Sequence, residues 1–101
     1  METLNRYTLY IGLNNMYSKI QEVSTEDAQR TVNRICGDNT TQVVKGHYTH
    51  EDGTQVDETT LKVELLFKDD AQVRLMCHDL KRELQQETIA VNKEVSMSAL
   101  W

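Results

Sequence analysis

The sequence predicts an α+β fold, a ferredoxin-like β-α-β-β-α-β plait in which a four-stranded antiparallel sheet carries two helices on one face. Two β-rich runs between Thr40 and Phe67 are joined by an Asp52-Gly53 turn, which is a strong hairpin signal. One amphipathic helix precedes this hairpin, another follows it, and an extended segment lies at each end of the chain. This order constrains the architecture tightly but leaves the activity open, because the fold hosts many functions.

The first strand is predicted over Tyr7–Leu13, where residues alternate between two faces. The nine residues from Asn14 to Glu22 break this alternation, and long loops of this kind often carry binding residues. The first helix is predicted over Thr25–Cys36. Ser24 can cap its N-terminus, and Gly37 supplies the left-handed conformation that ends it.

The third strand has an apolar face and a polar face. Its residues alternate between apolar Leu61, Val63, Leu65 and Phe67 and polar Glu58, Thr60, Lys62 and Glu64. Asp69 or Asp70 can cap the second helix, and the apolar stripe of this helix repeats at helical spacing as far as Leu84. The fourth strand is predicted over Thr88–Val95. Both helices must cover the single apolar face of the sheet, so the other face stays open.

The open face is predicted to be mostly polar. It carries Thr8, Tyr10, Lys45, His47, Thr60, Lys62, Glu64, Ala90 and Asn92. A chain of 101 residues has the usual size of one domain, so we expect a single ferredoxin-like domain over 1–101, with an apolar C-terminal tail over 96–101. Leu100 and Trp101 in this tail need a cover, which predicts a homo-oligomer with these residues at its interface.

The composition limits the partners. Asp and Glu number 16 against 11 Lys and Arg, and no basic cluster forms the stripe that binding to a phosphate backbone requires. We therefore expect no duplex nucleic acid partner. The chain starts without the basic and apolar segments of a signal peptide and has no apolar run of membrane-spanning length, which predicts a cytoplasmic protein without membrane contact. Cys36 and Cys77 lie on predicted apolar helix faces, where free cysteines behave as small hydrophobes.

No set of residues predicts catalysis, a metal site or a cofactor. His47 and His50 would point to opposite faces of their strand, which disfavours metal ligation by the pair. Neither cysteine has a histidine on its own side, and no phosphate-binding or dinucleotide-binding motif is present. The carboxylates near the hairpin are best interpreted as solvated. Glu58 is the exception, because it lies within a strand on the open face and could orient a polar ligand.

A candidate ligand-binding site is predicted where the Asn14–Glu22 loop meets the open face, since a long loop beside a half-open sheet favours a concave surface. Its candidate residues are Tyr10, Tyr17, Lys45, His47, Glu58, Thr60 and Lys62. The lysines would meet a phosphate or carboxylate, a tyrosine would stack on a ring, and Glu58 would accept a hydrogen bond. The alternative is an ordinary solvated face with cross-strand Lys and Glu pairs.

Three short motifs stand out on the last three predicted strands. They are Gly46-His47-Tyr48 before the Asp52-Gly53 turn, Val56-Asp57-Glu58-Thr59-Thr60-Leu61 on the next strand, and Gln86-Glu87-Thr88-Ile89-Ala90-Val91 before and within the last. Together they resemble a family of small uncharacterised proteins of bacteria, phages and mobile elements. The resemblance supports the fold and implies a setting in phages or mobile elements. Small proteins of that setting often block host defence, so it also implies a counter-defence role.

The sequence therefore predicts a non-enzymatic binding protein. In this interpretation it inhibits a host defence component, either by docking on a host protein or by sequestering a small nucleotide. Two alternatives stay open. One is a small ferredoxin-like enzyme that works as a dimer, with a substrate pocket between the open face and the helices, and the other is a bacterial module for ligand sensing or oligomerisation.

Overall fold

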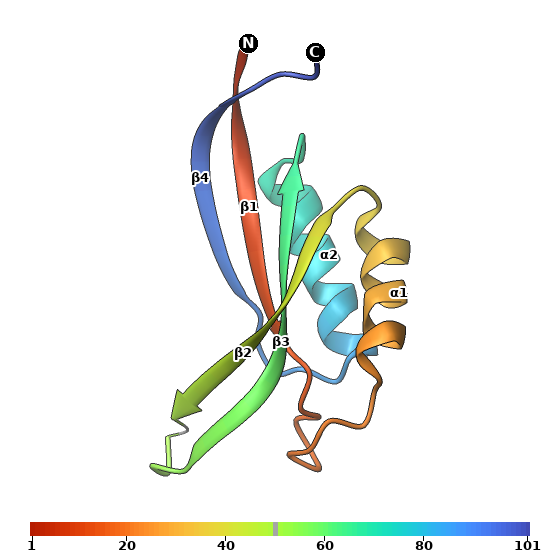
Figure 1. The fold of residues 1–101 in the computed structure, drawn as a ribbon, viewed down its shortest axis with the longest axis vertical. Coiled ribbons are helices and arrows are strands. Elements are labelled where there is room, and N and C mark those ends of the chain that lie inside the picture. Colours follow the sequence, from red (N-terminus) through yellow and green to blue (C-terminus); the bar gives the residue numbers. More distant parts are fainter. Residues whose placement is uncertain (50) are drawn as a thin grey trace.

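The computed structural model describes residues 1–49 and 51–101, and their six elements follow the predicted order (Figure 1). The elements are β1 (Glu2–Gly12), α1 (Thr25–Cys36), β2 (Thr40–Thr49), β3 (Gln55–Leu66), α2 (Asp70–Glu83) and β4 (Ala90–Ser98). The strands form one antiparallel sheet in the order β2-β3-β1-β4, and both helices lie on the same face of it. The predicted ferredoxin-like plait is confirmed.

The helix boundaries follow from local hydrogen bonds. Ser24 Oγ accepts a hydrogen bond from the backbone N–H of Asp27 at 3.1 Å, which caps α1. Asp69 caps α2 and forms a reciprocal capping box with Gln72. Helix α1 ends at Gly37, whose φ of 69° lies in the region that glycine adopts without strain.

The core lies between the sheet and the two helices. Strand residues of alternating position meet one stripe from each helix; the buried set is Tyr7, Leu9, Ile11, Leu13, Ala28, Val32, Cys36, Leu61, Val63, Leu65, Val73, Leu80 and Leu84. Both cysteines are free. Burial raises the pKa of the Cys36 thiol to about 11, so this thiol stays protonated and unreactive at neutral pH.

The first and last strands, β1 and β4, extend further toward the chain termini than predicted. β4 continues to Ser98, which pairs with Glu2, so residues 96–98 of the expected tail belong to the strand. The β1–β4 ribbon and the β2–β3 hairpin project past the helices at opposite ends of the molecule (Figure 1). Val95 therefore has no helix above it and is 70% exposed. Phe67, predicted on the apolar face, lies just past the end of β3 and is also exposed.

The predicted facing of Lys45 and His47 is wrong. β2 pairs with β3 so that Lys45 lies opposite Thr59, His47 opposite Asp57, and Gly46 opposite Glu58. Directly paired residues share a face, so Lys45 and His47 lie on the helix side of the sheet. The expected facing of β2 was shifted by one residue, and in a strand that shift moves every side chain to the other face.

A polar cluster of three side chains links the first and last strands to α2. The Tyr7 hydroxyl donates a hydrogen bond to Asp70 Oδ1 at 2.5 Å, and Lys93 Nζ lies 2.9 Å from the same oxygen. The Tyr7 hydroxyl, followed by the Lys93 ammonium, lowers the pKa of Asp70. The same carboxylate raises the pKa of Lys93 through its hydrogen bond. The cluster therefore stabilises the charged forms of both groups.

In the part of the chain that the structure describes, no helix is long and apolar enough to cross a membrane. Within residues 1–49 and 51–101, no three His, Cys, Asp or Glu side chains gather where they could hold a metal ion. His50, considered with His47 as a disfavoured metal ligand, lies outside the described residues. His47 itself pairs with Asp57, with 2.6 Å between Nδ1 and Oδ1.

Candidate functional site

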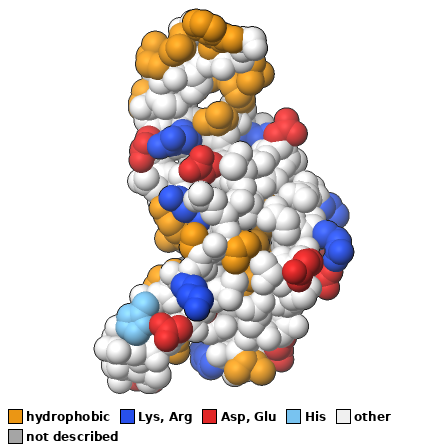
Figure 2. All heavy atoms as spheres, viewed as in Figure 1, with side chains coloured by type: hydrophobic (Ala, Val, Ile, Leu, Met, Phe, Trp, Pro, Cys, Tyr) orange, Lys and Arg blue, Asp and Glu red, His pale blue; other side chains and the backbone are white. Residues whose placement is uncertain are grey.

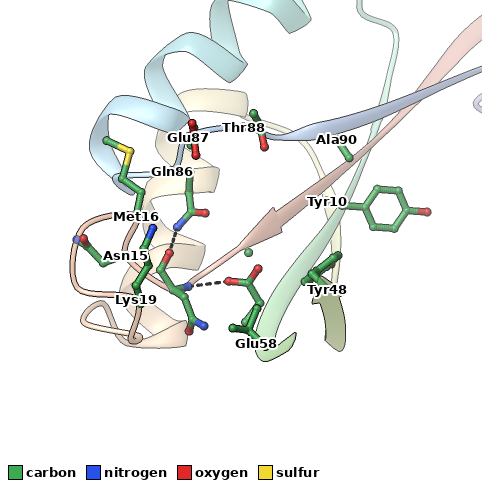
Figure 3. Close-up of a pocket in the computed structure, with 13 residues that line it drawn as sticks. Tyr10, Asn15, Met16, Lys19, Tyr48, Glu58, Gln86, Glu87, Thr88 and Ala90 are labelled. Atoms are coloured by element: carbon green, nitrogen blue, oxygen red, sulfur yellow. Dashed lines mark hydrogen bonds between the residues drawn. The ribbon is translucent and has the colours of Figure 1, made fainter. Parts of the chain in front are cut away.

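A cavity of about 470 Å³ lies on the open face of the sheet, where three separate segments meet (Figure 3). The end of β1 and the following loop, the β2–β3 hairpin, and the segment before β4 line it with Tyr10, Gly12, Asn14, Asn15, Met16, Lys19, Tyr48, Val56, Glu58, Gln86, Glu87, Thr88 and Ala90. This volume is in the range of small-molecule sites.

The loop after β1 forms a fixed wall of the cavity. Asn15 is only 7% exposed; its Oδ1 accepts a hydrogen bond from the backbone N–H of Tyr17 at 2.8 Å, and its Nδ2 donates to the side chain of Gln85. Gln86 Nε2 donates to the backbone oxygen of Asn14 at 2.7 Å (Figure 3). These bonds tie the loop to the segment before β4, so two of the three lining segments hold one another in place.

Glu58 brings a carboxylate from β3 to the end of β1. Its Oε2 accepts a hydrogen bond from the backbone N–H of Asn14 at 3.0 Å (Figure 3). The carboxyl group lies directly above Gly12, where a β-carbon would overlap it. The side chain is half-buried, and it lines the cavity. The protein thus holds this carboxylate at a fixed point of the site.

Two tyrosines line the same cavity. Tyr10 comes from β1 and Tyr48 from β2 (Figure 3). The Tyr48 ring lies over Gly46, and its hydroxyl is 3.4 Å from Thr60 Oγ1. Lys62 Nζ lies 6.0 Å from the centre of the Tyr10 ring. Aromatic rings of this kind can stack on a base or interact with a cation.

The candidate residues predicted from the sequence fall into three groups. Tyr10 and Glu58 line the cavity. Thr60 and Lys62 lie next to the lining residues. Thr60, which is 1% exposed, contacts Tyr48, and Lys62 lies over the ring of Tyr10.

The third group lies outside the cavity. Tyr17 is 74% exposed on the loop, with only its backbone held by Asn15. Lys45 and His47 are on the helix side of the sheet, as the pairing of β2 with β3 requires.

Sequence reasoning missed Asn15, Lys19, Tyr48 and Gln86. Tyr48 had a usable signal, because a glycine two positions earlier in the strand leaves space that an aromatic ring can fill. The other three lie in irregular segments, where no periodicity reports which way a side chain points. Among the lining residues, all of which the structure describes, Lys19 is the only Lys or Arg.

Solved structures with this fold include two of phage SAM lyase. One is a phage SAM lyase in the apo state, with a TM-score of 0.76 and 18% identity over 100% of this chain and 97% of that chain. The other is a phage SAM lyase in complex with S-methyl-5'-thioadenosine, with a TM-score of 0.70 and 17% identity over 91% of this chain and 81% of that chain. Identities this low establish a likeness of fold. No protein-family model and no curated protein sequence matches the chain.

The comparison contradicts the prediction of a non-enzymatic protein that acts by docking or by sequestering a nucleotide. Both of these structures, which share the fold over nearly the whole chain, are of a lyase, which is an enzyme. The finding favours the alternative of a small ferredoxin-like enzyme. The sequence pointed away from catalysis because neither cysteine has a histidine on its own side and no phosphate-binding or dinucleotide-binding motif is present.

Proposed function

We propose that this protein is an enzyme that cleaves S-adenosylmethionine (SAM) and releases S-methyl-5'-thioadenosine. The proposal rests on the likeness to phage SAM lyase over nearly the full length of both chains. It is supported by the cavity, which has the size of a small-molecule site and offers two aromatic rings and a fixed carboxylate. SAM is a metabolite of the cytoplasm, so we also propose the cytoplasmic location that the sequence predicts.

The bond that breaks follows from the product. S-methyl-5'-thioadenosine keeps the methyl group, the sulfur and the 5' carbon of SAM, so the bond between sulfur and Cγ of the amino-acid part breaks, and its electron pair goes to sulfur. A lyase adds no water. We propose that the carboxylate oxygen of the same molecule bonds to Cγ, so that the amino-acid part leaves as homoserine lactone. The sulfonium and the carboxylate lose their charges together, so atoms and charge balance.

The cavity supplies binding and orientation for this reaction. We place Glu58 against the sulfonium, because a fixed carboxylate attracts that cation more strongly than the neutral thioether of the product. The attraction disappears when the sulfonium is neutralised, which favours product release. Tyr10 and Tyr48 offer faces for the adenine or the sulfonium. We assign the substrate carboxylate to Lys19, because it is the lysine among the lining residues. The cavity would hold the amino-acid part of SAM folded back on itself, which lowers the entropic part of the activation barrier.

We also propose that the protein self-associates through the end where both termini lie. Hydrophobic side chains gather there on the surface (Figure 2), and the exposed ones include Met1, Val95, Met97, Leu100 and Trp101. Trp101 is 97% exposed. An apolar group of this size at one end of a small domain needs a cover, and a second copy of the chain provides one that is always present.

The test is to incubate the purified protein with SAM and follow the products by NMR. S-methyl-5'-thioadenosine and homoserine lactone should form in equal amounts, and in isotopically labelled water the lactone should carry no label. Glu58→Gln should slow the reaction, whereas the matched change Glu64→Gln, on the same strand and face but outside the cavity, should not. Intact SAM after prolonged incubation, whether or not it binds, would contradict the proposed function.

A further inference from the structure

The four glycines are of two kinds. Gly37 and Gly53 have φ values of 69° and 86°, and nothing lies within 4 Å of the position that a β-carbon would take. They are needed for the backbone conformation of a helix end and a turn. Gly12 and Gly46 lie in strands and have no such φ value. Glycine in the interior of a strand weakens it, so these two positions call for a different explanation.

The space above each strand glycine is filled by the end of a cavity side chain. The three atoms nearest to a β-carbon on Gly12 are the carboxyl atoms of Glu58, and those nearest to one on Gly46 belong to the phenol group of Tyr48. All of them would come closer than the 3.0 Å that real β-carbons respect. Because no backbone atom is among them, an added methyl group would displace the side chain and leave the strand in place.

The two glycines also place these side chains in one cavity. Gly46 lies directly opposite Glu58 in the β2–β3 ladder, the Tyr48 ring lies over Gly46, and the Glu58 carboxyl group reaches across to Gly12 on β1. A side chain at position 46 would displace the ring. A side chain at position 12 would push the carboxylate away from the backbone N–H of Asn14.

We infer that Gly12 and Gly46 are positioning residues that hold the Glu58 carboxylate and the Tyr48 ring in place in one cavity, which makes the site selective for a sulfonium nucleoside over its neutral thioether. This inference rests on the proposed function. A cavity that offers both a carboxylate and an aromatic face is a suitable environment for a soft cation, and the neutral product gains little from either group. The selectivity depends on geometry, so it should be lost when either group moves.

Gly12→Ala and Gly46→Ala test the inference directly. Each should lower kcat/KM for SAM about 10- to 100-fold, mainly through KM, because small misplacements of positioning groups have effects of this order. Neither should lower the melting temperature, since alanine suits a strand better than glycine. Gly53→Ala is the matched control; it should lower the melting temperature and leave kcat/KM of the folded protein unchanged.

Double variants separate positioning from general damage. Gly12→Ala should add little to the loss already caused by Glu58→Ala, and Gly46→Ala should add little to Tyr48→Leu, because each pair acts through one group. Wild-type kcat/KM in both glycine variants, or fully additive losses in both double variants, would overturn the inference.

A structural readout distinguishes a failure of this inference from a failure of the proposed function. The amide resonance of Asn14 reports its hydrogen bond to Glu58. In Gly12→Ala this resonance should move to the position that it has in Glu58→Ala, and in Gly53→Ala it should stay where it is. A wild-type protein that leaves SAM intact would reject the proposed function, while an unmoved Asn14 resonance in Gly12→Ala would reject the positioning role.

Discussion

On β3, Leu61, Val63 and Leu65 face the helices and are fully buried, whereas Glu58 and Lys62 face the other way and remain half-buried. The covered face is defined by side chains that fill space, as in any packed core. The open face is defined as much by side chains that are missing, since Gly12 and Gly46 leave the places that Glu58 and Tyr48 occupy. Changes on the covered face should therefore reduce stability, and changes on the open face should reduce activity.

The largest effect is expected on the covered face. Leu65→Ala should lower the free energy of unfolding by about 2 to 5 kcal/mol, because it removes a fully buried side chain and leaves a cavity. The folded fraction should keep the wild-type kcat/KM. Thr60→Ala, on the open face beside Tyr48, should cost only about 1 kcal/mol. Denaturant melts measure the free energy of unfolding of both variants. Equal losses in Leu65→Ala and Thr60→Ala would contradict the difference between the two faces.

The next largest effect is expected at Glu58. Glu58→Gln keeps the shape of the side chain and an oxygen that can accept the Asn14 hydrogen bond, but it removes the charge. The loss of the Coulomb attraction between this carboxylate and the sulfonium should lower kcat/KM about 10- to 100-fold, or about 1.4 to 2.7 kcal/mol. The melting temperature should stay close to wild type. If Glu58→Gln unfolds more easily yet cleaves SAM at the wild-type rate, then Glu58 contributes to stability and not to activity.

A smaller effect is expected at the end of the molecule where both termini lie. Deleting Ala99–Trp101 removes two exposed apolar side chains and spares β4, which ends at Ser98. The dissociation constant for self-association should rise at least about tenfold, or about 1.4 kcal/mol, in analytical ultracentrifugation. Leu75→Ser, which changes an exposed leucine on α2, serves as the control and should leave association unchanged. A full-length protein that stays monomeric at high micromolar concentration would contradict the proposed interface.

The smallest effect concerns Asp70, a polar group at the edge of the covered face. The Tyr7 hydroxyl, and then Lys93, lower its pKa, so in acid the folded protein binds fewer protons than the unfolded chain. The resulting stability is complete above the unfolded pKa of about 3.9 and is lost as the pH falls through the folded pKa. In thermal melts, Asp70→Asn and Tyr7→Phe should both lose less stability between pH 5 and pH 2 than wild type. Identical pH profiles in all three proteins would rule out this linkage.

The sequence by itself determined the features that depend on neighbouring residues. Helix α1 begins after Ser24 and ends before Gly37 because a side-chain cap and a left-handed glycine act over three or four residues. The two faces of β3 could be predicted because alternation is a property of one strand. These local patterns, taken in order, were sufficient to predict the ferredoxin-like plait and to select Tyr10 and Glu58.

Only the tertiary structure decided what depends on residues far apart in the chain. The facing of β2 depends on its pairing with β3, and a strand with weak alternation does not reveal it, so Tyr48 took the place expected for Lys45 and His47. The cavity depends on contacts such as those of Asn14 with Glu58 and with Gln86, which lie 44 and 72 residues away. Such contacts form only when the whole sheet brings its loops together, because no local hydrogen bond or periodicity specifies them.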